Sequence, residues 1–211
     1  MICISISDSS QLHPCIEEGA QLLELRLDLI GIHPSELYPK IPDGIKTVAC
    51  CREGKYSEQE RIDILNAAIE LGADYVDIEL ESSEEIAANI IPVAEKHGCE
   101  VIFSHHDFQA TPGIVELKTK MEACFKRGGV IAKIATQIHT QEDVINLLYL
   151  YSEPGRKIVL GMGDAGRITR VAAPLLGSEF TFASPGEGRE TAPGQMSASQ
   201  LNAIYKILNG S

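Results

Sequence analysis

The sequence predicts a closed (βα)8 barrel, the TIM-barrel fold, on three observations. Eight short apolar runs, rich in β-branched residues, alternate with stretches of helical periodicity. Regular alternation of this kind produces parallel strands joined by right-handed crossovers, and eight units suffice to close a barrel. The 211 residues contain no obvious linker or internal repeat, so we expect a single barrel domain over residues 1–211. A doubly wound open sheet is the alternative, but no GxGxxG motif follows the first run.

The elements follow one another along the chain in a regular order. We expect strands at residues 2–6, 22–28, 46–51, 75–80, 101–106, 130–136, 157–161 and 180–183. We expect helices at residues 12–20, 57–72, 83–97, 114–126, 141–151, 170–176 and 197–208. The second helix has a capping-box start at Ser57 and Glu60 and a glycine stop at Gly72. A loop rich in proline and glycine connects the second strand to the third.

Composition excludes several classes of function. The net charge of −12 disfavours nucleic acid and anionic membrane surfaces as partners. No apolar run approaches the twenty residues of a membrane span, and we expect no secretory signal. The six cysteines form no CxxC pair, which is typical of reduced thiols, so we expect a cytoplasmic protein. An anionic substrate would need a local cluster of positive charge.

A lysine stands in the middle of the sixth predicted strand. Lys133 lies in the apolar run from Val130 to Thr136, where a charged and unpaired ammonium would be costly. A neutral amine in an apolar setting attacks carbonyl groups, which is the basis of Schiff-base catalysis. The alternative is a lysine near a strand end whose ammonium reaches water.

The second strand carries charges on one face. Leu23, Leu25 and Leu27 alternate with Glu24, Arg26 and Asp28, so in a barrel the leucines would face the helices and the charges would point inward. Inward charges serve either a binding site or an internal network of paired charges.

Other strands also end in polar groups. Arg52 and Glu53 follow the third strand, Asp77 and Glu79 share a face of the fourth, and a histidine pair ends the fifth. We considered a metal site made of His105, His106, Asp107, Asp77 and Glu79. Adjacent histidines on a strand point apart, so we expect no metal.

Two later segments offer binding groups. Residues 161–166, rich in glycine, follow the seventh strand, where barrels often bind phosphate. Arg170 offers a bidentate fork for a carboxylate or a phosphate. Residues 184–195 follow the eighth strand and form either a mobile lid or a simple surface loop.

Taken together, these motifs resemble the type I 3-dehydroquinate dehydratase family. The matching segments are Glu24-Leu25-Arg26-Leu27-Asp28, Asp77-Ile78-Glu79-Leu80, Ser104-His105-His106-Asp107-Phe108 with Thr111-Pro112, Lys133-Ile134-Ala135, Ile168-Thr169-Arg170 and Ala192-Pro193-Gly194-Gln195. They occur in the family's order and span almost the whole chain.

The resemblance implies a role for each matching residue. Lys133 would form the Schiff base, His106 would be the general acid and base, and Glu53 would orient the histidine. The implied substrate-binding residues are Ser5, Glu24, Arg26, Arg52, Arg170, Thr191 and Gln195. Thr191 stands where the family usually has serine, and it keeps the hydroxyl. The resemblance also implies a stand-alone homodimer that acts on 3-dehydroquinate in the shikimate pathway.

The residue types suit that chemistry. An iminium on Lys133 would act as an electron sink, and His106 could remove the proton next to it and then protonate the departing hydroxyl. Repulsion from Arg26, Arg52 and Arg170 would favour the neutral form of Lys133. No metal, nucleotide or organic cofactor is expected. The alternatives are a class I Schiff-base aldolase acting on a phosphorylated sugar and a non-enzymatic protein that binds a small carboxylate.

Overall fold

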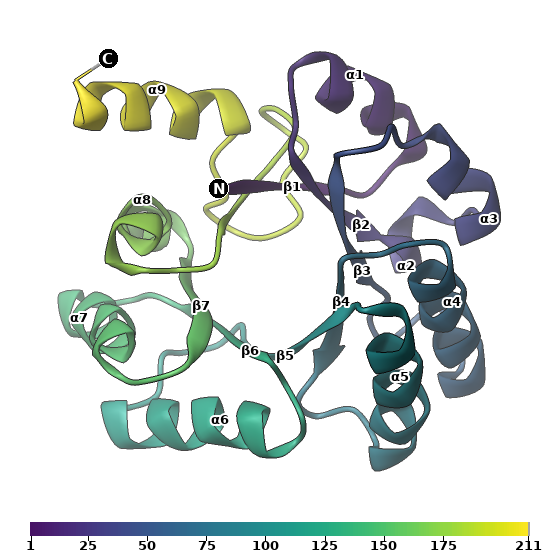
Figure 1. Ribbon diagram of the computed structural model, residues 1–211. Helices are drawn as coiled ribbons and strands as arrows, with labels where there is room; N and C mark the ends of the chain where they lie inside the picture. The colour runs from purple at the N-terminus through teal and green to yellow at the C-terminus, as the bar shows by residue number, and fades with distance from the viewer. Residues whose placement is uncertain (211) are drawn as a thin grey trace.

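The computed structural model describes residues 1–210, in which eight parallel strands form a barrel ringed by helices (Figure 1). The strands are β1 (Ile2–Ile6), β2 (Leu22–Arg26), β3 (Lys46–Cys50), β4 (Tyr75–Glu79), β5 (Glu100–Asp107), β6 (Ile131–Gln137), β7 (Arg156–Met162) and β8 (Thr181–Ala183). Their order around the sheet is β7-β6-β5-β4-β3-β2-β1-β8. Between β7 and β8, the Glu179 N–H donates to the Lys157 carbonyl (3.1 Å). The predicted barrel is confirmed.

Helices cover the outside of the barrel. They are α1 (Leu12–Glu17), α2 (Leu27–Ile30), α3 (Pro34–Leu37), α4 (Glu58–Glu70), α5 (Glu84–His97), α6 (Ile114–Lys126), α7 (Gln141–Tyr149), α8 (Arg167–Ala172) and α9 (Ala198–Asn209). The predicted capping box of α4 is present, because the Ser57 and Glu60 side chains each accept from the other residue's N–H. None of the described helices has the length and apolar composition to cross a bilayer.

The segment after β2 differs from the prediction. The strand ends at Arg26 rather than at Asp28, and Asp28 lies in the short helix α2. The turn brings the Asp28 carboxylate back onto the Arg26 guanidinium, which makes two hydrogen bonds to it (3.0 and 2.6 Å). The predicted loop that follows contains α3, which begins with Pro34, a residue favoured in the first turn of a helix.

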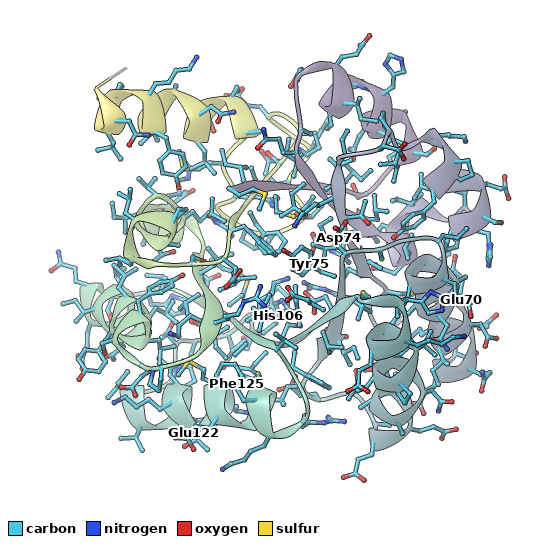
Figure 2. All side chains as sticks on the ribbon, in the orientation of Figure 1. Glu70, Asp74, Tyr75, His106, Glu122 and Phe125 are labelled. Carbon is cyan, nitrogen blue, oxygen red and sulfur yellow. The ribbon has the colours of Figure 1, made fainter. Side chains whose placement is uncertain are left out.

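Two apolar layers hold the barrel together. The outer layer packs the strands against the helices and includes Leu23, Leu25 and Phe103. The inner layer fills the space enclosed by the strands and consists of Cys3, Leu22, Val48, Tyr75, Ile102, Ile131, Ile158, Leu160, Ala173, Phe180 and Phe182. Figure 2 shows side chains filling that space.

The inward-facing residues change from apolar to polar along several strands, whereas those of β7 stay apolar. In β2, Leu22 belongs to the inner layer, and the next residues on that face are Glu24 and Arg26. In β6, Ile131 is followed on the same face by Lys133. Because side chains alternate with period two, the carboxyl ends of the strands bring these polar groups into one place.

At the opposite end of the barrel, Arg156 joins two strands and the approach to a third. Its guanidinium pairs with Glu100 (2.6 Å) and with Glu179 (2.7 Å). Arg156 lowers the pKa of the Glu100 carboxyl. The pairs connect the starts of β5 and β7 to the residues just before β8, where the barrel closes.

We expect Arg156→Gln to lower the free energy of unfolding by about 1 kcal/mol at neutral pH. A bidentate network of ion pairs stabilises the fold only slightly more than an isolated surface pair does. A carboxyl whose folded-state pKa is lowered contributes stability above its unfolded value, here 4.5, and loses it as pH falls further. The difference from the wild type should therefore shrink below about pH 4.5. Urea unfolding at several pH values measures this.

Arg167→Gln is the matched control, because among residues 1–210 Arg167 pairs only with the exposed Asp164 on its own segment. A loss of stability as large in this control as in Arg156→Gln would contradict a special role for the Arg156 network.

Candidate functional site

A cavity opens where the polar ends of the strands meet. It is lined by Ser5, Glu24, Arg26, Arg52, His106, Phe108, Lys133, Ala135, Leu160, Met162, Arg170, Phe182, Thr191, Ala192 and Gln195. All the predicted site residues except Glu53 are among them. A larger hollow of about 750 Å³ lies elsewhere, between α1, α9 and the start of β1, and contains none of the predicted residues.

Lys133 lies in the wall of this cavity and is 3% exposed. Its Nζ donates to Asp77 Oδ2 (2.6 Å) and lies 3.5 Å from Glu24 Oε1. The ring of Phe182 is on another side, with its centroid 4.2 Å from Nζ. A buried cation next to two carboxylates is paired rather than isolated.

The protonation state of Lys133 corrects one expectation. The cavity does contain arginines, and Arg52 lowers the pKa of Lys133, as burial does. The carboxylates of Asp77 and Glu24 outweigh both and hold the pKa above its ordinary value. The prediction of a neutral resting amine was therefore wrong, because it left out the negative charges that share the cavity wall.

His106 projects into the cavity from β5, near the centre of the barrel in Figure 2. Its Nε2 lies 3.0 Å from Arg52 Nη2. A guanidinium only donates, so Nε2 must hold a lone pair and the ring proton of a neutral imidazole is on Nδ1. Burial lowers the pKa of His106 well below 6.5, and Arg52 and Lys133 lower it further. His106 is therefore a neutral base whose buried Nδ1 has no hydrogen-bond partner in the described part of the chain.

Glu53 lies outside the cavity. Its side chain is exposed, and its backbone N–H donates to Glu79 Oε2 (3.4 Å). Among residues 1–210, Glu53 makes no hydrogen bond to His106, because the chain turns outward after Arg52. The predicted role of Glu53 in orienting the histidine gains no support from this geometry.

The three arginines of the cavity differ in how far their charge is compensated. Arg26 is neutralised by Asp28 at 2.6 Å. Arg52 contacts the imidazole of His106 and leaves its Nε unpartnered. Arg170 is 2% exposed; within residues 1–210 its Nε has no partner, and its guanidinium makes one long bond, from Nη1 to the Phe182 carbonyl (3.4 Å). Burial lowers the pKa of Arg170 to about 10. Arg170 and Arg52 are therefore the groups that can receive an anion.

The segment between β8 and α9 covers one side of the cavity, looping back beside β1 (Figure 1). Gln195 accepts hydrogen bonds from the Thr191 N–H and hydroxyl and donates to Ser5 Oγ (3.3 Å). Gly194 has φ +69°, and a Cβ there would lie 2.1 Å from the Gly163 carbonyl oxygen. The segment is thus docked on the residues after β7 by a contact that requires glycine.

The three glycine amides of the segment after β7 are already hydrogen-bonded within the chain. The Gly161 N–H donates to Thr169 Oγ1, the Gly163 N–H to the Pro193 carbonyl and the Gly166 N–H to the Gly163 carbonyl. A phosphate cradle needs such donors aimed at the ligand. The three glycine N–H groups are instead used in hydrogen bonds within the chain.

Two sets of residues bear on metal binding. His105 and His106 point to opposite sides, with His105 paired to Glu81 (2.5 Å) and His106 in the cavity. Glu24, Cys50 and Asp77 have ligand atoms within 4.8 Å of one another, a spacing that can hold an ion. The Lys133 ammonium lies against both carboxylates of that set and supplies positive charge there.

Sequence reasoning considered Asp77 only as a ligand of a metal site that it did not favour, and it assigned no role to Ser104. Both are buried, and the Ser104 hydroxyl donates to Asp77 Oδ1 (2.5 Å). The strand period could have indicated that Ser104 faces the barrel interior, because Ser104 and His106 share a face of β5. That Asp77 reaches Lys133 from two strands away could not be read from either strand alone.

Comparisons with known proteins agree with this geometry. The family model of type I 3-dehydroquinase matches residues 2–211. A Methanosarcina barkeri protein named 3-dehydroquinate dehydratase is 38% identical over 208 residues, covering 90% of this chain and 86% of its own length. A Methanococcus maripaludis protein of the same name is 37% identical, covering 99% of this chain and 100% of its own. The crystal structure of the Aquifex aeolicus 3-dehydroquinate dehydratase superposes with a TM-score of 0.84 at 29% identity, covering 98% of each chain.

A family model that spans nearly the whole chain, relatives above one third identity and a shared barrel all lead to the same assignment. The chain belongs to the type I 3-dehydroquinase family, a family of hydro-lyases.

Proposed function

We propose that this chain dehydrates 3-dehydroquinate to 3-dehydroshikimate through a Schiff base on Lys133, in the shikimate pathway of aromatic amino acid biosynthesis. We infer the covalent route chiefly because Lys133 is buried in a cavity that also contains a neutral histidine and an uncompensated arginine. Family membership and the names of the relatives support the substrate.

The imine would form without a net change of charge at Nζ. The ammonium of Lys133 and the substrate ketone combine to an iminium and one molecule of water, so the positive charge stays on the nitrogen. The nitrogen must release a proton to attack, and the water that leaves takes up the protons lost by the nitrogen. The iminium then withdraws electrons from the neighbouring carbon and acidifies its proton.

His106 is the base that this step needs. Its Nε2 holds a lone pair, and Arg52 occupies that lone pair in the structure, 3.0 Å away. When Arg52 turns to a substrate oxygen, Nε2 is free to take the proton, and the imidazolium can give it to the departing hydroxyl. Water then hydrolyses the conjugated iminium, releases the enone and restores the ammonium of Lys133.

The substrate carboxylate would bind Arg170. This guanidinium is buried and unpaired by any carboxylate among residues 1–210, so an anionic ligand relieves its cost of burial. Ser5, Thr191 and Gln195 would hold the substrate hydroxyls, and Glu24 has an oxygen without a hydrogen-bond partner facing the same space. These groups need no cofactor. The homodimer and the cytoplasmic location stay predictions.

The aldolase alternative is less well supported. Its phosphate would have to bind after β7, where the amides of Gly161, Gly163 and Gly166 are already hydrogen-bonded within the chain. An assay of aldol cleavage on phosphorylated sugars, run beside dehydration of 3-dehydroquinate, separates the two functions.

Borohydride should trap the imine on Lys133. Intact and peptide mass spectrometry after reduction in the presence of 3-dehydroquinate should show a ligand-sized gain on the Lys133 peptide. Lys133→Ala should lose both the adduct and the dehydration activity, because no other amine occupies the cavity. Dehydration at the wild-type rate by Lys133→Ala would rule out the covalent route.

His106→Ala should separate the two halves of the reaction. The imine can still form on Lys133, so borohydride trapping should persist. The rate of dehydration should fall by roughly 10² or more, which is the usual contribution of a positioned general base. His105→Ala is the matched control, because that neighbouring ring lies on the other side of the strand and pairs with Glu81. A similar loss in both variants would count against the assignment of His106.

The acid limb of kcat/KM should lie below pH 6.5. Burial, Arg52 and Lys133 lower the pKa of His106, so the neutral base persists as pH falls through that value. Arg52→Gln removes one of these causes and should move the limb upward, whatever its effect on the height of the profile. A wild-type limb at or above 6.5, unmoved in Arg52→Gln, would contradict the electrostatics described here.

A further inference from the structure

Asp77 lies behind Lys133, away from the cavity. It is 4% exposed, comes from the middle of β4, and is not part of the cavity lining. Its Oδ2 accepts from Lys133 Nζ at 2.6 Å, the shortest contact that this nitrogen makes with a carboxylate. Asp77 therefore touches the reacting nitrogen, and Lys133 stands between Asp77 and the substrate.

Ser104 fixes the other oxygen of the carboxylate. Its hydroxyl donates to Asp77 Oδ1 at 2.5 Å, and Ser104 is the direct Cα partner of Lys133 in the ladder between β5 and β6. Three consecutive strands therefore bring the three side chains together: Ser104 pairs with Lys133 in the ladder, and Asp77 lies two residues before Glu79, the ladder partner of Ser104 on β4. With both of its oxygens accepting, Asp77 is held as an ionised carboxylate.

Glu24 is the other carboxylate near Lys133, and its situation differs. Its Oε1 lies 3.5 Å from Nζ, has no hydrogen-bond partner and belongs to a residue that lines the cavity. Glu24 can therefore turn to a substrate hydroxyl, whereas Asp77 has no freedom to leave the nitrogen.

We propose that Asp77, held by Ser104, is the counter-ion that keeps the Lys133 imine protonated throughout the dehydration. This deepens the proposed function and rests on it. An imine withdraws electrons effectively only as the iminium, and a buried cation is stable only beside a compensating charge. Because ammonium and iminium carry the same charge at Nζ, one fixed carboxylate serves the resting enzyme and the intermediate alike.

The surroundings of the nitrogen make this carboxylate necessary. The charged, titratable and aromatic groups that face Lys133 are Asp77 from β4, Glu24 from β2, Cys3 from β1, Cys50 from β3, Arg52 and His106 at the cavity mouth, and Phe182 from β8. Burial raises the pKa of the Cys3 and Cys50 thiols, so they stay neutral. Without Asp77, only Glu24 would oppose the charge of Arg52.

Asp77→Asn tests the proposal in the full chain. The variant keeps the shape of the side chain and removes its charge, so the imine should lose its proton at lower pH. We expect the alkaline limb of the kcat profile to move down by roughly 1 to 3 pH units, the effect of one opposite charge at this distance. Borohydride trapping should fall at pH 9 relative to the wild type and recover towards pH 6, because borohydride reduces the iminium faster than the neutral imine.

Two further variants keep the result interpretable. Ser104→Ala keeps the Asp77 charge and removes the hydroxyl that holds the carboxylate, so the alkaline limb should shift in the same direction but by less. If circular dichroism shows that Asp77→Asn does not fold, the shift in Ser104→Ala tests the proposal instead. Asp74→Asn is the control, because Asp74 accepts from the Thr47 N–H (2.9 Å) just before β4, and an asparagine oxygen can accept the same bond. Its limb should not move.

The outcomes separate the two proposals. The counter-ion proposal alone would be overturned if the wild-type enzyme turns over 3-dehydroquinate and is trapped by borohydride, but neither Asp77→Asn nor Ser104→Ala shifts the alkaline limb. A wild-type enzyme that neither dehydrates 3-dehydroquinate nor forms an adduct would overturn the proposed function and the counter-ion with it. A fall in kcat at every pH, with no change in the shape of the profile, would show a merely structural role for Asp77 and also overturn the proposal.

Discussion

The buried ion pair between Lys133 and Asp77 is the interaction on which the site depends. Lys133 Nζ and Asp77 Oδ2 lie 2.6 Å apart inside a barrel that apolar side chains fill at the amino-terminal ends of the strands. In such surroundings, either charge alone would be strongly destabilising, so the two must occur together and in register. The parallel pairing of β4, β5 and β6 meets that requirement, since Ser104 pairs with Lys133 and its hydroxyl reaches the Asp77 carboxylate on the neighbouring strand.

Local charge in this protein runs against its net charge. The chain carries −12 overall, yet the cavity contains three arginines and a lysine. Their charges are distributed by partner: Asp28 neutralises Arg26, Asp77 and Glu24 neutralise Lys133, and Arg170 is left uncompensated. Among residues 1–210, Arg52 has no carboxylate partner either, so attraction for an anion is concentrated in two guanidinium groups, which give a bound carboxylate a defined orientation.

Much of this arrangement followed from periodicity in the sequence. The strand period placed Glu24 and Arg26 on the inner face and set His106 apart from His105, and the regular alternation of strands and helices predicted the barrel. The errors concern features that no period describes. The chain turns sharply after Arg26, so Asp28 leaves the strand. Glu53 faces solvent, and its role in orienting His106 stays a prediction. The charged state of Lys133 depends on Asp77, a neighbour 56 residues away along the chain.

The contact between Gly163 and Gly194 links the segment that covers the cavity to the loop after β7, beside the hydrogen bond from the Gly163 N–H to the Pro193 carbonyl. A Cβ at position 194 would lie 2.1 Å from the Gly163 carbonyl oxygen, and Gly194 also occupies the left-handed region of backbone space. A side chain at position 194 can therefore be accepted only if the backbone after β7 moves as well. During evolution, the covering segment and the loop after β7 should thus change as a coupled pair, so that insertions or transplants of one without the other would produce a barrel with an ill-fitting cover.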